Sequence, residues 1–466
     1  MLVCADVWVG LGAVSLRPRQ LQALDDLRAA YAQGYRAPIL VAPTGFGKTH
    51  TSAEIIRSAI AKGRTVWFLA HLREILFATS AKLATEGIDH GFIMAGQPER
   101  PDAPVQIVMV QTAARRLGRY ANPGLIIIDE CHLAMAETYG KVIADAGRPL
   151  LLGLTATPTR LDGKGLRGVF DTIVPTCGTA ELIAEGLLAP IRYYAPSRPD
   201  LTGVRTVAGD YSASDACEVM DKPSITGDAV AHFQRLAQGR TAIVFCIDIE
   251  HARNTALTFA AAGHQAAILH GATPQDEREN ILRQLATGDI QVVVNCQLLV
   301  AGVDVPSVGC IIQLAPSKSL TKYLQSIGRG LRTAPGKPDL IVLDHAGNAF
   351  THGLPTDPRE WSLDGTPKRT KADNDNEPVR QCERCYAVFK PQAVCPMCGH
   401  VHEMKPRVIK LTKGELAELK AVERKQERKE QGKAQTFEEL AAYAARKGYK
   451  PGWARFIWQS RQRRRA

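Results

Sequence analysis

The sequence predicts an α/β protein with two parallel-sheet domains in tandem, followed by a cysteine-rich module and a basic helical tail. Short apolar runs alternate with stretches of helical character over most of the 466 residues. The alternation stops once, at the linker-like "APSRPD" (195–200), and then resumes. Strands that are apolar on both faces and separated by helices are typical of parallel sheets covered by helices on both sides.

The first domain is expected over residues 16–196, after a lead-in (1–15) that contains Asp6 and lacks the basic start of a signal peptide. The second domain is expected over 197–352. The predicted strands of the first domain are 38–42, 65–70, 105–110, 124–129 and 149–156. Those of the second domain are 241–246, 265–270, 290–295, 309–315 and 339–344. A polar, turn-rich linker (353–378), a cysteine module (379–404) and a helical tail (405–466) are expected to follow.

The composition is that of an ordinary globular protein, with 45% hydrophobic and 23% charged residues. No apolar run approaches the ~20 residues that a membrane-spanning helix needs, so we expect no membrane partner. The odd total of 11 cysteines, four of them clustered, and the lack of a secretion signal favour a reducing cytoplasm, with association to the nucleoid if the source is bacterial or phage. We also expect a monomer. The net charge of +11 is located in the tail, because residues 405–466 contain 18 basic and 7 acidic residues. A basic tail favours a polyanion such as nucleic acid as the partner, and a merely solubilising tail is the alternative.

The stretch "APTGFGKT" (42–49) follows the first predicted strand and predicts a phosphate-binding loop. Thr44, Gly45 and Gly47 would let backbone N–H groups surround the phosphates of a nucleotide. Lys48 would place its charge on the β- and γ-phosphates, and the hydroxyl of Thr49 would bind Mg²⁺. The strict pattern has glycine where this chain has Ala42, and a simple glycine turn before a helix is the alternative interpretation.

Two adjacent carboxylates, Asp129 and Glu130, end the apolar run "LIIIDECHLA". Ionised acids at the tip of a buried strand are costly without a compensating cation. Asp129 is expected to hold Mg²⁺, and Glu130 to position and polarise the water that attacks the nucleotide. Upstream, the amide of Gln20 in "LRPRQLQAL" could read the donors and acceptors of adenine.

Six stretches appear in the order of the superfamily 2 helicase motifs, which the chain resembles over roughly residues 16–350. They are "LRPRQ", "APTGFGKT", "DECH", "TATP" (155–158), "LLVAGVDVP" (298–306) and "QSIGRGLR" (325–332). With the downstream cysteine module, "LAHLREIL" and "GLTATPTRLDGKGL" look most like the RadD (YejH) type of DNA-repair helicase. The resemblance implies two tandem RecA-like domains.

The second domain would then complete the ATP site. Arg329 and Arg332, three apart on a helix, fall on one face and can act as arginine fingers on the γ-phosphate. Gly302 and Asp304 would contact ATP. The resemblance further implies a coupling role for Thr155 and Thr157. It also implies backbone contacts to nucleic acid from His71, Arg73, Gln111 and Thr112.

One position departs from the helicase pattern. Relatives usually carry Thr-Glu before the glycine of the fifth motif, whereas this chain has Val300 and Ala301. We therefore hypothesise that the grip on the nucleic-acid strand, or the coupling of that grip to ATP hydrolysis, is altered. The substitutions Val300→Thr and Ala301→Glu would test this. Unchanged nucleic-acid-stimulated hydrolysis in the reverted chain would contradict this hypothesis.

The stretch "CERCYAVFKPQAVCPMCGH" contains two Cys-x₂-Cys pairs, Cys382/Cys385 and Cys395/Cys398. Four thiolates can close a tetrahedral Zn²⁺ site, and an Fe–S cluster is the alternative. His400 and His402 are expected to be bystanders. A purely structural role for this zinc ribbon and a binding role are both open.

The end of the tail, "YKPGWARFIWQSRQRRRA", interleaves Trp453, Phe456 and Trp458 with arginines. The aromatic side chains could stack on unpaired bases or pack as one apolar helix face, and we favour packing. Arg461 and the arginines at 463–465 are expected to contact phosphates.

Together these observations predict an ATP-dependent DNA helicase or translocase that uses ATP, Mg²⁺ and Zn²⁺ and acts in repair, recombination or replication. A replication or repair protein could be a further partner. An RNA helicase is the alternative within the class. An ATP-dependent nucleic-acid clamp that does not separate strands is the alternative outside it.

Overall fold

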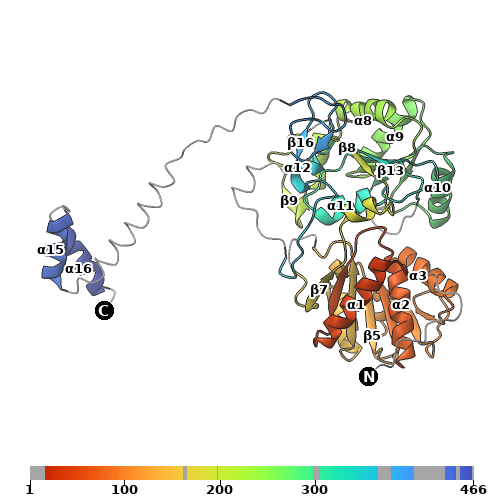
Figure 1. Ribbon diagram of the computed structural model, residues 1–466, viewed down its shortest axis with the longest axis horizontal. Helices are drawn as coiled ribbons and strands as arrows, with labels where there is room; N and C mark the ends of the chain where they lie inside the picture. Colours follow the sequence, from red (N-terminus) through yellow and green to blue (C-terminus); the bar gives the residue numbers. More distant parts are fainter. Residues whose placement is uncertain are drawn as a thin grey trace, which may run out of the picture. The chain divides into compact units, whose positions relative to one another are not determined.

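The computed structural model describes residues 16–160, 165–196, 198–296, 305–365, 379–402, 436–447 and 452–463. Its two compact units, 1–402 and 403–466, are considered separately. The first unit contains two parallel sheets with helices packed on them, and a small cysteine module (Figure 1).

The first sheet has seven parallel strands in the order β3-β4-β2-β5-β6-β1-β7. β6 lies between β5 and β1, with Gly153 paired to both Ile128 and Ile39. The segments that follow β1, β5 and β6 therefore meet at one edge of the sheet, which is where α/β sheets bind ligands. The strands are β1 (Pro38–Val41), β2 (Val66–Ala70), β3 (Gly91–Ile93), β4 (Val105–Met109), β5 (Leu125–Asp129), β6 (Leu150–Thr155) and β7 (Thr172–Pro175).

Helices connect these strands and bury apolar residues against the sheet. They are α1 (Pro18–Ala32), α2 (Lys48–Ala61), α3 (Arg73–Thr85), α4 (Val110–Ala113), the 3₁₀ turn η1 (Cys131–Leu133), α5 (Glu137–Asp145) and α6 (Thr179–Ala184). The inner strands are buried on both faces, as their apolar sequences predict: β1, β2 and the first four residues of β5 are fully buried.

The second sheet has six parallel strands in the order β12-β13-β11-β14-β15-β8. Its strands are β8 (Ile191–Tyr194), β11 (Ala242–Cys246), β12 (Ala266–Leu269), β13 (Val292–Cys296), β14 (Cys310–Gln313) and β15 (Leu340–Asp344). Its helices are α7 (Ala213–Met220), α8 (Pro223–Leu236), α9 (Ile249–Ala261), α10 (Gln275–Thr287), α11 (Leu320–Gly328) and α12 (Asn348–His352). A hairpin of β9 (Thr206–Val207) and β10 (Asp210–Tyr211) precedes α7.

The ten predicted strands are present, with ends within two residues of the predicted ones. The boundary expected at 196/197 does not coincide with the division between the sheets. β8 lies before it but pairs with β15, with Ile191 opposite Leu340. The Pro-containing stretch after β8 indicated a domain linker, whereas the chain enters the second sheet one strand earlier.

The linker expected over 353–378 also needs correction. Residues 353–365 are described, and Leu363 is 5% exposed in the core of the first sheet, with Trp361 packed beside it. The polar composition of 365–378 had suggested a flexible segment, but the apolar side chains just before it find a core. Residues 366–378 lie outside the described part of the chain.

The cysteine module contains a short antiparallel pair, β16 (Arg380–Gln381) and β17 (Val388–Phe389). It packs on the edge strand β8, where Ala195 N donates to Tyr386 O at 3.0 Å. Cys382, Cys395 and Phe389 belong to the same buried cluster as Phe233 of α8. The module is therefore continuous with the second sheet's core.

The C-terminal unit contains two described helices, α15 (Phe437–Lys447) and α16 (Trp453–Arg463), which confirms the helical prediction for these residues. Leu440 and Ala444 of α15 pack with Trp453 and Trp458 of α16. These two aromatic side chains thus form an apolar face, as favoured from the sequence. The side chain of Phe456 lies outside the described residues.

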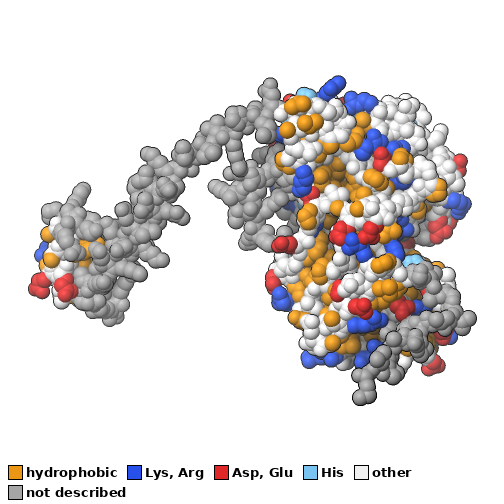
Figure 2. Space-filling model, viewed as in Figure 1, with side chains coloured by type: hydrophobic (Ala, Val, Ile, Leu, Met, Phe, Trp, Pro, Cys, Tyr) orange, Lys and Arg blue, Asp and Glu red, His pale blue; other side chains and the backbone are white. Residues whose placement is uncertain are grey.

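The surface of the first unit is mixed in charge. On the described part of the face drawn in Figure 2, Lys and Arg side chains are interspersed with Asp and Glu side chains. This agrees with the balance of charges outside the tail. Within the described ranges, no helix is both long and apolar enough to cross a bilayer.

Candidate nucleotide site and cysteine cluster

The loop between β1 and α2 has the backbone of a phosphate-binding loop. Gly45 and Gly47 have φ angles of 83° and 94°, in the left-handed region that favours glycine. A Cβ atom at Gly47 would lie 2.4 Å from Gln20 Nε2, and one at Gly45 would lie 2.3 Å from Leu188 Cδ2. Glycine is therefore required at both positions.

Helix α2 begins at Lys48, so the first N–H groups of the helix face the loop. The ammonium of Lys48 donates to Ala42 O at 3.0 Å, which folds the side chain back over the loop. Thr49 lies in the first turn of the same helix. The positive end of the helix and the Lys48 charge together make an anion-binding concavity.

Gln20 and its neighbour Arg17 hold this loop from α1. The Gln20 amide is buried and donates to Phe46 O at 2.9 Å, and Arg17 Nη2 donates to the same oxygen at 2.9 Å. Gln20 was expected to read adenine, and in this structure its amide N–H contacts the loop backbone. Gln20, Arg17 and Phe46 also line a cavity of about 260 Å³ next to the loop.

Asp129 and Glu130 lie at the end of β5, one strand removed from the loop. Asp129 Oδ1 is buried and has no hydrogen-bond partner among the described residues. Burial raises the pKa of Asp129, and the charge of Glu130 raises it further. A buried carboxylate oxygen without a donor is what a cation ligand requires, so Asp129 fits the predicted Mg²⁺ role.

Glu130 has a left-handed backbone (φ 48°), which is uncommon for a residue with a side chain. Its Oε2 lies 3.3 Å from His132 Nδ1 and accepts from Thr155 Oγ1 at 3.4 Å. Burial alone would raise the pKa of Glu130. The hydrogen bond and charge of His132, with the charges of Lys48 and Arg329, hold it below its ordinary value. Glu130 is therefore set to remain ionised.

Residues of the second sheet's helix α11 reach into this site. Gln325 Nε2 donates to Glu130 Oε2 at 3.3 Å, and Thr321 Oγ1 donates to Thr159 O at 3.1 Å. Gly328 lies so close to the loop that a Cβ atom there would be 2.8 Å from Thr44 Oγ1. The two sheets thus form one site.

Arg329 follows α11 directly and is partly buried. Burial lowers the pKa of Arg329, and the charge of Glu130 acts in the opposite direction. Arg332 is partly buried and makes a strand-like bridge with Leu188. The structure therefore brings Lys48, Asp129, Glu130 and Arg329 into one electrostatic cluster, whereas Arg332 lies at the adjoining edge.

Two predicted ATP contacts, Gly302 and Asp304, lie outside the described residues, as do Val300 and Ala301. Of the expected nucleic-acid contacts, His71 lines a cavity of about 530 Å³ together with Glu130 and Gln325. Gln111 Nε2 donates to His71 O at 3.4 Å.

Gln325 was not among the predicted site residues. A signal for it existed, since it precedes Arg329 by four residues and therefore shares its helix face. Arg17 was missed as well, and its contact with the loop depends on a tertiary approach that local sequence does not encode.

The four cysteines of the module converge. Their Sγ atoms all lie within 4.8 Å of one another, and two pairs, Cys382/Cys398 and Cys385/Cys395, are 3.7 Å apart. A tetrahedron with Zn–S bonds of about 2.3 Å has S–S edges of about 3.8 Å, whereas a disulfide bond is about 2.05 Å long. These two distances match the edge of a tetrahedral zinc site and exclude a disulfide within either pair. His402 packs against Phe389, with ring centroids 5.7 Å apart.

Two family models match the chain. Residues 13–160 match the model described as "Type III restriction enzyme, res subunit", and residues 224–334 match "Helicase conserved C-terminal domain". A 51.5 kDa protein of a Lactococcus phage is 32% identical over 392 residues, which cover 83% of this chain and 82% of the phage protein.

A Saccharomyces cerevisiae protein described as an ATP-dependent helicase, IRC3, is 28% identical to this chain over 355 residues. The match covers 71% of this chain but only 51% of the yeast protein. Among solved structures, a fragment described as an HsdR subunit of a type I restriction enzyme from Vibrio vulnificus superposes with a TM-score of 0.58 at 20% identity. It covers 75% of this chain and 67% of that chain. This last similarity shows the fold.

Proposed function

The chain belongs to superfamily 2 of the helicases and is an ATP-dependent DNA helicase or translocase, and we propose that it hydrolyses ATP between its two sheets. In this proposal Thr44, Gly45, Gly47 and Lys48 hold the phosphates. Thr49 and Asp129 hold Mg²⁺, which would neutralise charge on the β- and γ-phosphates when bound. Gln20, Gly302 and Asp304 are proposed to contact the rest of the nucleotide.

Glu130 is proposed to orient the attacking water. The water oxygen bonds to the γ-phosphorus, the bond from the γ-phosphorus to the β–γ bridging oxygen breaks, and the proton of the water moves toward the Glu130 carboxylate. Arg329 and Arg332 would stabilise the charge that develops on the γ-phosphoryl oxygens. The low pKa of Glu130 supports this role, because the carboxylate stays ionised and able to accept a hydrogen bond from water.

The observation that carries the proposal is the contact from Gln325 to Glu130 across the cleft. This contact supports a role for the second domain in positioning the residue that would activate water. Hydrolysis would then require the sheets to be close together, and release of phosphate would let them separate. This dependence supports a motor that moves in steps along nucleic acid.

DNA is the proposed track, and the match to a restriction-enzyme model supports it. We further propose the repair type of helicase that "LAHLREIL" and the cysteine module resemble, with Zn²⁺ held by Cys382, Cys385, Cys395 and Cys398. The sulfur spacing supports zinc. The metal would stabilise a module that is too small to hold a core of its own.

Steady-state ATP hydrolysis without polymer, and with single-stranded DNA, duplex DNA or RNA, tests the proposal, with Lys48→Ala as the control. Stimulation by DNA alone is expected. Stronger stimulation by RNA would favour an RNA helicase. The clamp would be favoured if the protein hydrolysed ATP in a Lys48-dependent manner but neither displaced a strand from a forked DNA nor moved along DNA.

A further inference from the structure

Residues 353–365, which we call the strap, run from the second sheet's domain to the first sheet's domain. The strap begins just after α12 and ends beside the segment that follows β6. Nothing in the helicase motifs accounts for it, because the motif order ends at Arg332.

The start of the strap is held by the second domain. Tyr323 Oη of α11 donates to Gly353 O at 2.8 Å, and the Tyr323 ring stacks on His352. Arg359 Nη2 donates to His352 O at 3.2 Å and to Leu354 O at 3.0 Å, which curls this part of the strap on itself.

The end of the strap is held by the first domain. Leu363 O accepts from Leu166 N at 2.7 Å and from Arg167 N at 3.2 Å, and the Leu363 side chain is buried in that domain's core. The approach is so close that a Cβ atom at Gly165 would lie 2.1 Å from Leu363 O. Gly165 is therefore required for docking of this end.

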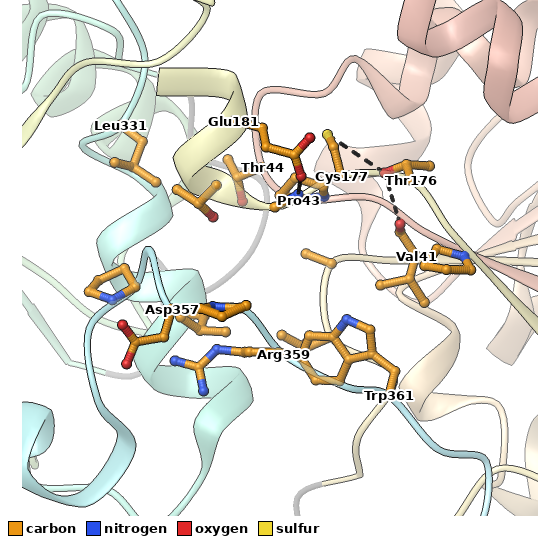
Figure 3. A pocket seen from close by; sticks show the side chains of 18 of the residues that line it. Val41, Pro43, Thr44, Thr176, Cys177, Glu181, Leu331, Asp357, Arg359 and Trp361 are labelled. Carbon is orange, nitrogen blue, oxygen red and sulfur yellow. Dashed lines mark hydrogen bonds between the residues drawn. The ribbon is translucent and has the colours of Figure 1, made fainter. Parts of the chain in front are cut away.

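Between its two ends the strap forms one wall of a cavity of about 320 Å³ at the nucleotide site. Figure 3 shows Asp357, Arg359 and Trp361 on one side of this cavity, with Pro43 and Thr44 of the phosphate loop across from them. Gln325 and Thr157 also line the cavity. The strap thus lies between the two domains at the cavity that they share.

The cysteine module holds the middle of the strap. Lys390, between the two Cys-x₂-Cys pairs, donates to Asp357 Oδ2 at 2.7 Å, and the Asp357 side chain is only 12% exposed. The same oxygen accepts from Leu354 N at 3.0 Å, so the ion pair supports the local turn. Because the module itself packs on β8, it gives the strap a fixed point on the second domain.

We propose that the strap is a tether that joins the cysteine module to the first domain and limits how far the nucleotide cleft opens between ATP cycles. About ten residues separate its anchors at Gly353 and Leu363, so even fully extended it spans at most about 36 Å. A tether of this length keeps the two halves of the site at high effective concentration. The cysteine module then acts as the tether's anchor, and Asp357, Lys390 and Leu363 are positioning residues.

Hydrogen exchange of the Leu166 and Arg167 amides, in the full-length protein without ATP, tests the anchoring directly. Lys390→Ala should accelerate their exchange about threefold or more, because it loosens the strap that supplies their acceptor. Arg384→Ala removes an exposed cation from the same module and should leave the exchange unchanged, and Lys390→Arg should restore protection. Equal exchange in the Lys390→Ala and parent proteins would overturn the anchoring role.

The effect on the cleft is tested by ATP turnover, which rests on the proposed function. Gly165→Ala should raise the KM for ATP about three- to tenfold and leave kcat at saturating ATP nearly unchanged, because bound ATP itself closes the cleft. Gly140→Ala, in α5 of the same domain with open space around its Cβ, is the matched control. Leu363→Ala is a second way to release the strap if Gly165→Ala fails to fold.

An unchanged KM together with faster Leu166 exchange would overturn the tether role, since the strap would have been released without consequence. A parallel fall in kcat and rise in KM would also contradict it, because the strap would then contribute to chemistry. The exchange experiment needs no hydrolysis, so its result stands even if the proposed ATPase activity fails.

Discussion

The side-chain amide of Gln325 donates to the carboxylate of Glu130 across the cleft, with Nε2 and Oε2 3.3 Å apart. Gln325 lies on α11 of the second domain and Glu130 follows β5 of the first, and the sequence separates them by 195 positions. The hydrogen bond thus joins the two domains at the proposed nucleotide site.

Replacing Gln325 by alanine should lower kcat for ATP hydrolysis about tenfold or more and leave the KM for ATP within about twofold of the parent, because Gln325 orients Glu130. Steady-state kinetics with saturating DNA measures both. Gln234→Ala, an exposed glutamine on α8, is the control. If Gln325→Ala raised KM alone, Gln325 would be a nucleotide contact instead.

Replacing Arg329 by alanine should reduce kcat by about 10³-fold or more, as expected for an arginine that stabilises the transition state. Nucleotide binding should persist, because Lys48 and the phosphate loop are intact. Arg329→Lys should rescue little, since an ammonium cannot reproduce the planar donor geometry. Comparing the equilibrium binding of a fluorescent ATP analogue with the turnover number separates binding from catalysis. If Arg329→Ala lost binding but kept normal turnover per bound ATP, the arginine-finger role of Arg329 would be contradicted.

As the pH is lowered, the ATPase activity should begin to fall at a higher pH than it would if the pKa of Asp129 were that of an ordinary aspartate. Burial and the charge of Glu130 raise the pKa of Asp129, so this carboxylate takes up a proton earlier as the pH falls. A protonated Asp129 cannot hold Mg²⁺, and Mg²⁺ and the proton therefore compete. Measuring kcat/KM from about pH 5 to 8 at two Mg²⁺ concentrations checks this. More Mg²⁺ should move the acid limb to lower pH, and an unmoved limb would exclude Asp129 as its origin.

The purified protein should contain one zinc per chain, bound by the four converging thiolates. Cys385→Ser should lose the metal, because three thiolates leave the tetrahedron open. Cys177→Ser, at a half-buried cysteine outside the module, should keep it. Elemental analysis of the intact protein measures the content, and iron with sulfide in place of zinc would establish the Fe–S alternative.

Replacing Arg461 and the arginines at 463–465 by glutamine should weaken DNA binding and flatten its dependence on salt. Each lost phosphate contact on single-stranded DNA reduces the slope of log K against log salt by about 0.7. These substitutions leave the packing of Trp453 and Trp458 against α15 in place, whereas deletion of α16 would expose Leu440. Binding to labelled oligonucleotides at several salt concentrations measures the slope, and an unchanged slope would show that these arginines do not touch DNA.

Several features of the site could be predicted from short stretches because their chemistry is local. Gly45 and Gly47 need a left-handed backbone, Lys48 starts a helix, and Asp129 and Glu130 end a buried strand. The spacing of the four cysteines likewise predicts that their side chains converge, and they do. Each of these requirements is satisfied within a few residues of chain, so the sequence alone determines them.

Other features depended on the tertiary structure. β8 pairs with β15, which lies almost 150 positions further along the chain. Arg17 and Gln20, at the start of α1, contact the phosphate loop that lies between β1 and α2. The polar composition of 365–378 predicts a linker, and the predicted linker (353–378) includes the strap. Docking of the strap depends on the burial of Leu363 and on the space that Gly165 leaves for it.

The sequence by itself therefore determined the class of fold, the backbone of the phosphate loop and the set of four cysteines that converge, since backbone conformation and residue spacing are properties of neighbouring residues. Only the tertiary structure decided that Gln325 contacts Glu130, that β8 pairs with β15 of the second sheet, and that the segment after the last motif packs on the first domain. Those outcomes rest on contacts between residues far apart in the chain. Such contacts form only where burial and close packing of the whole core favour them.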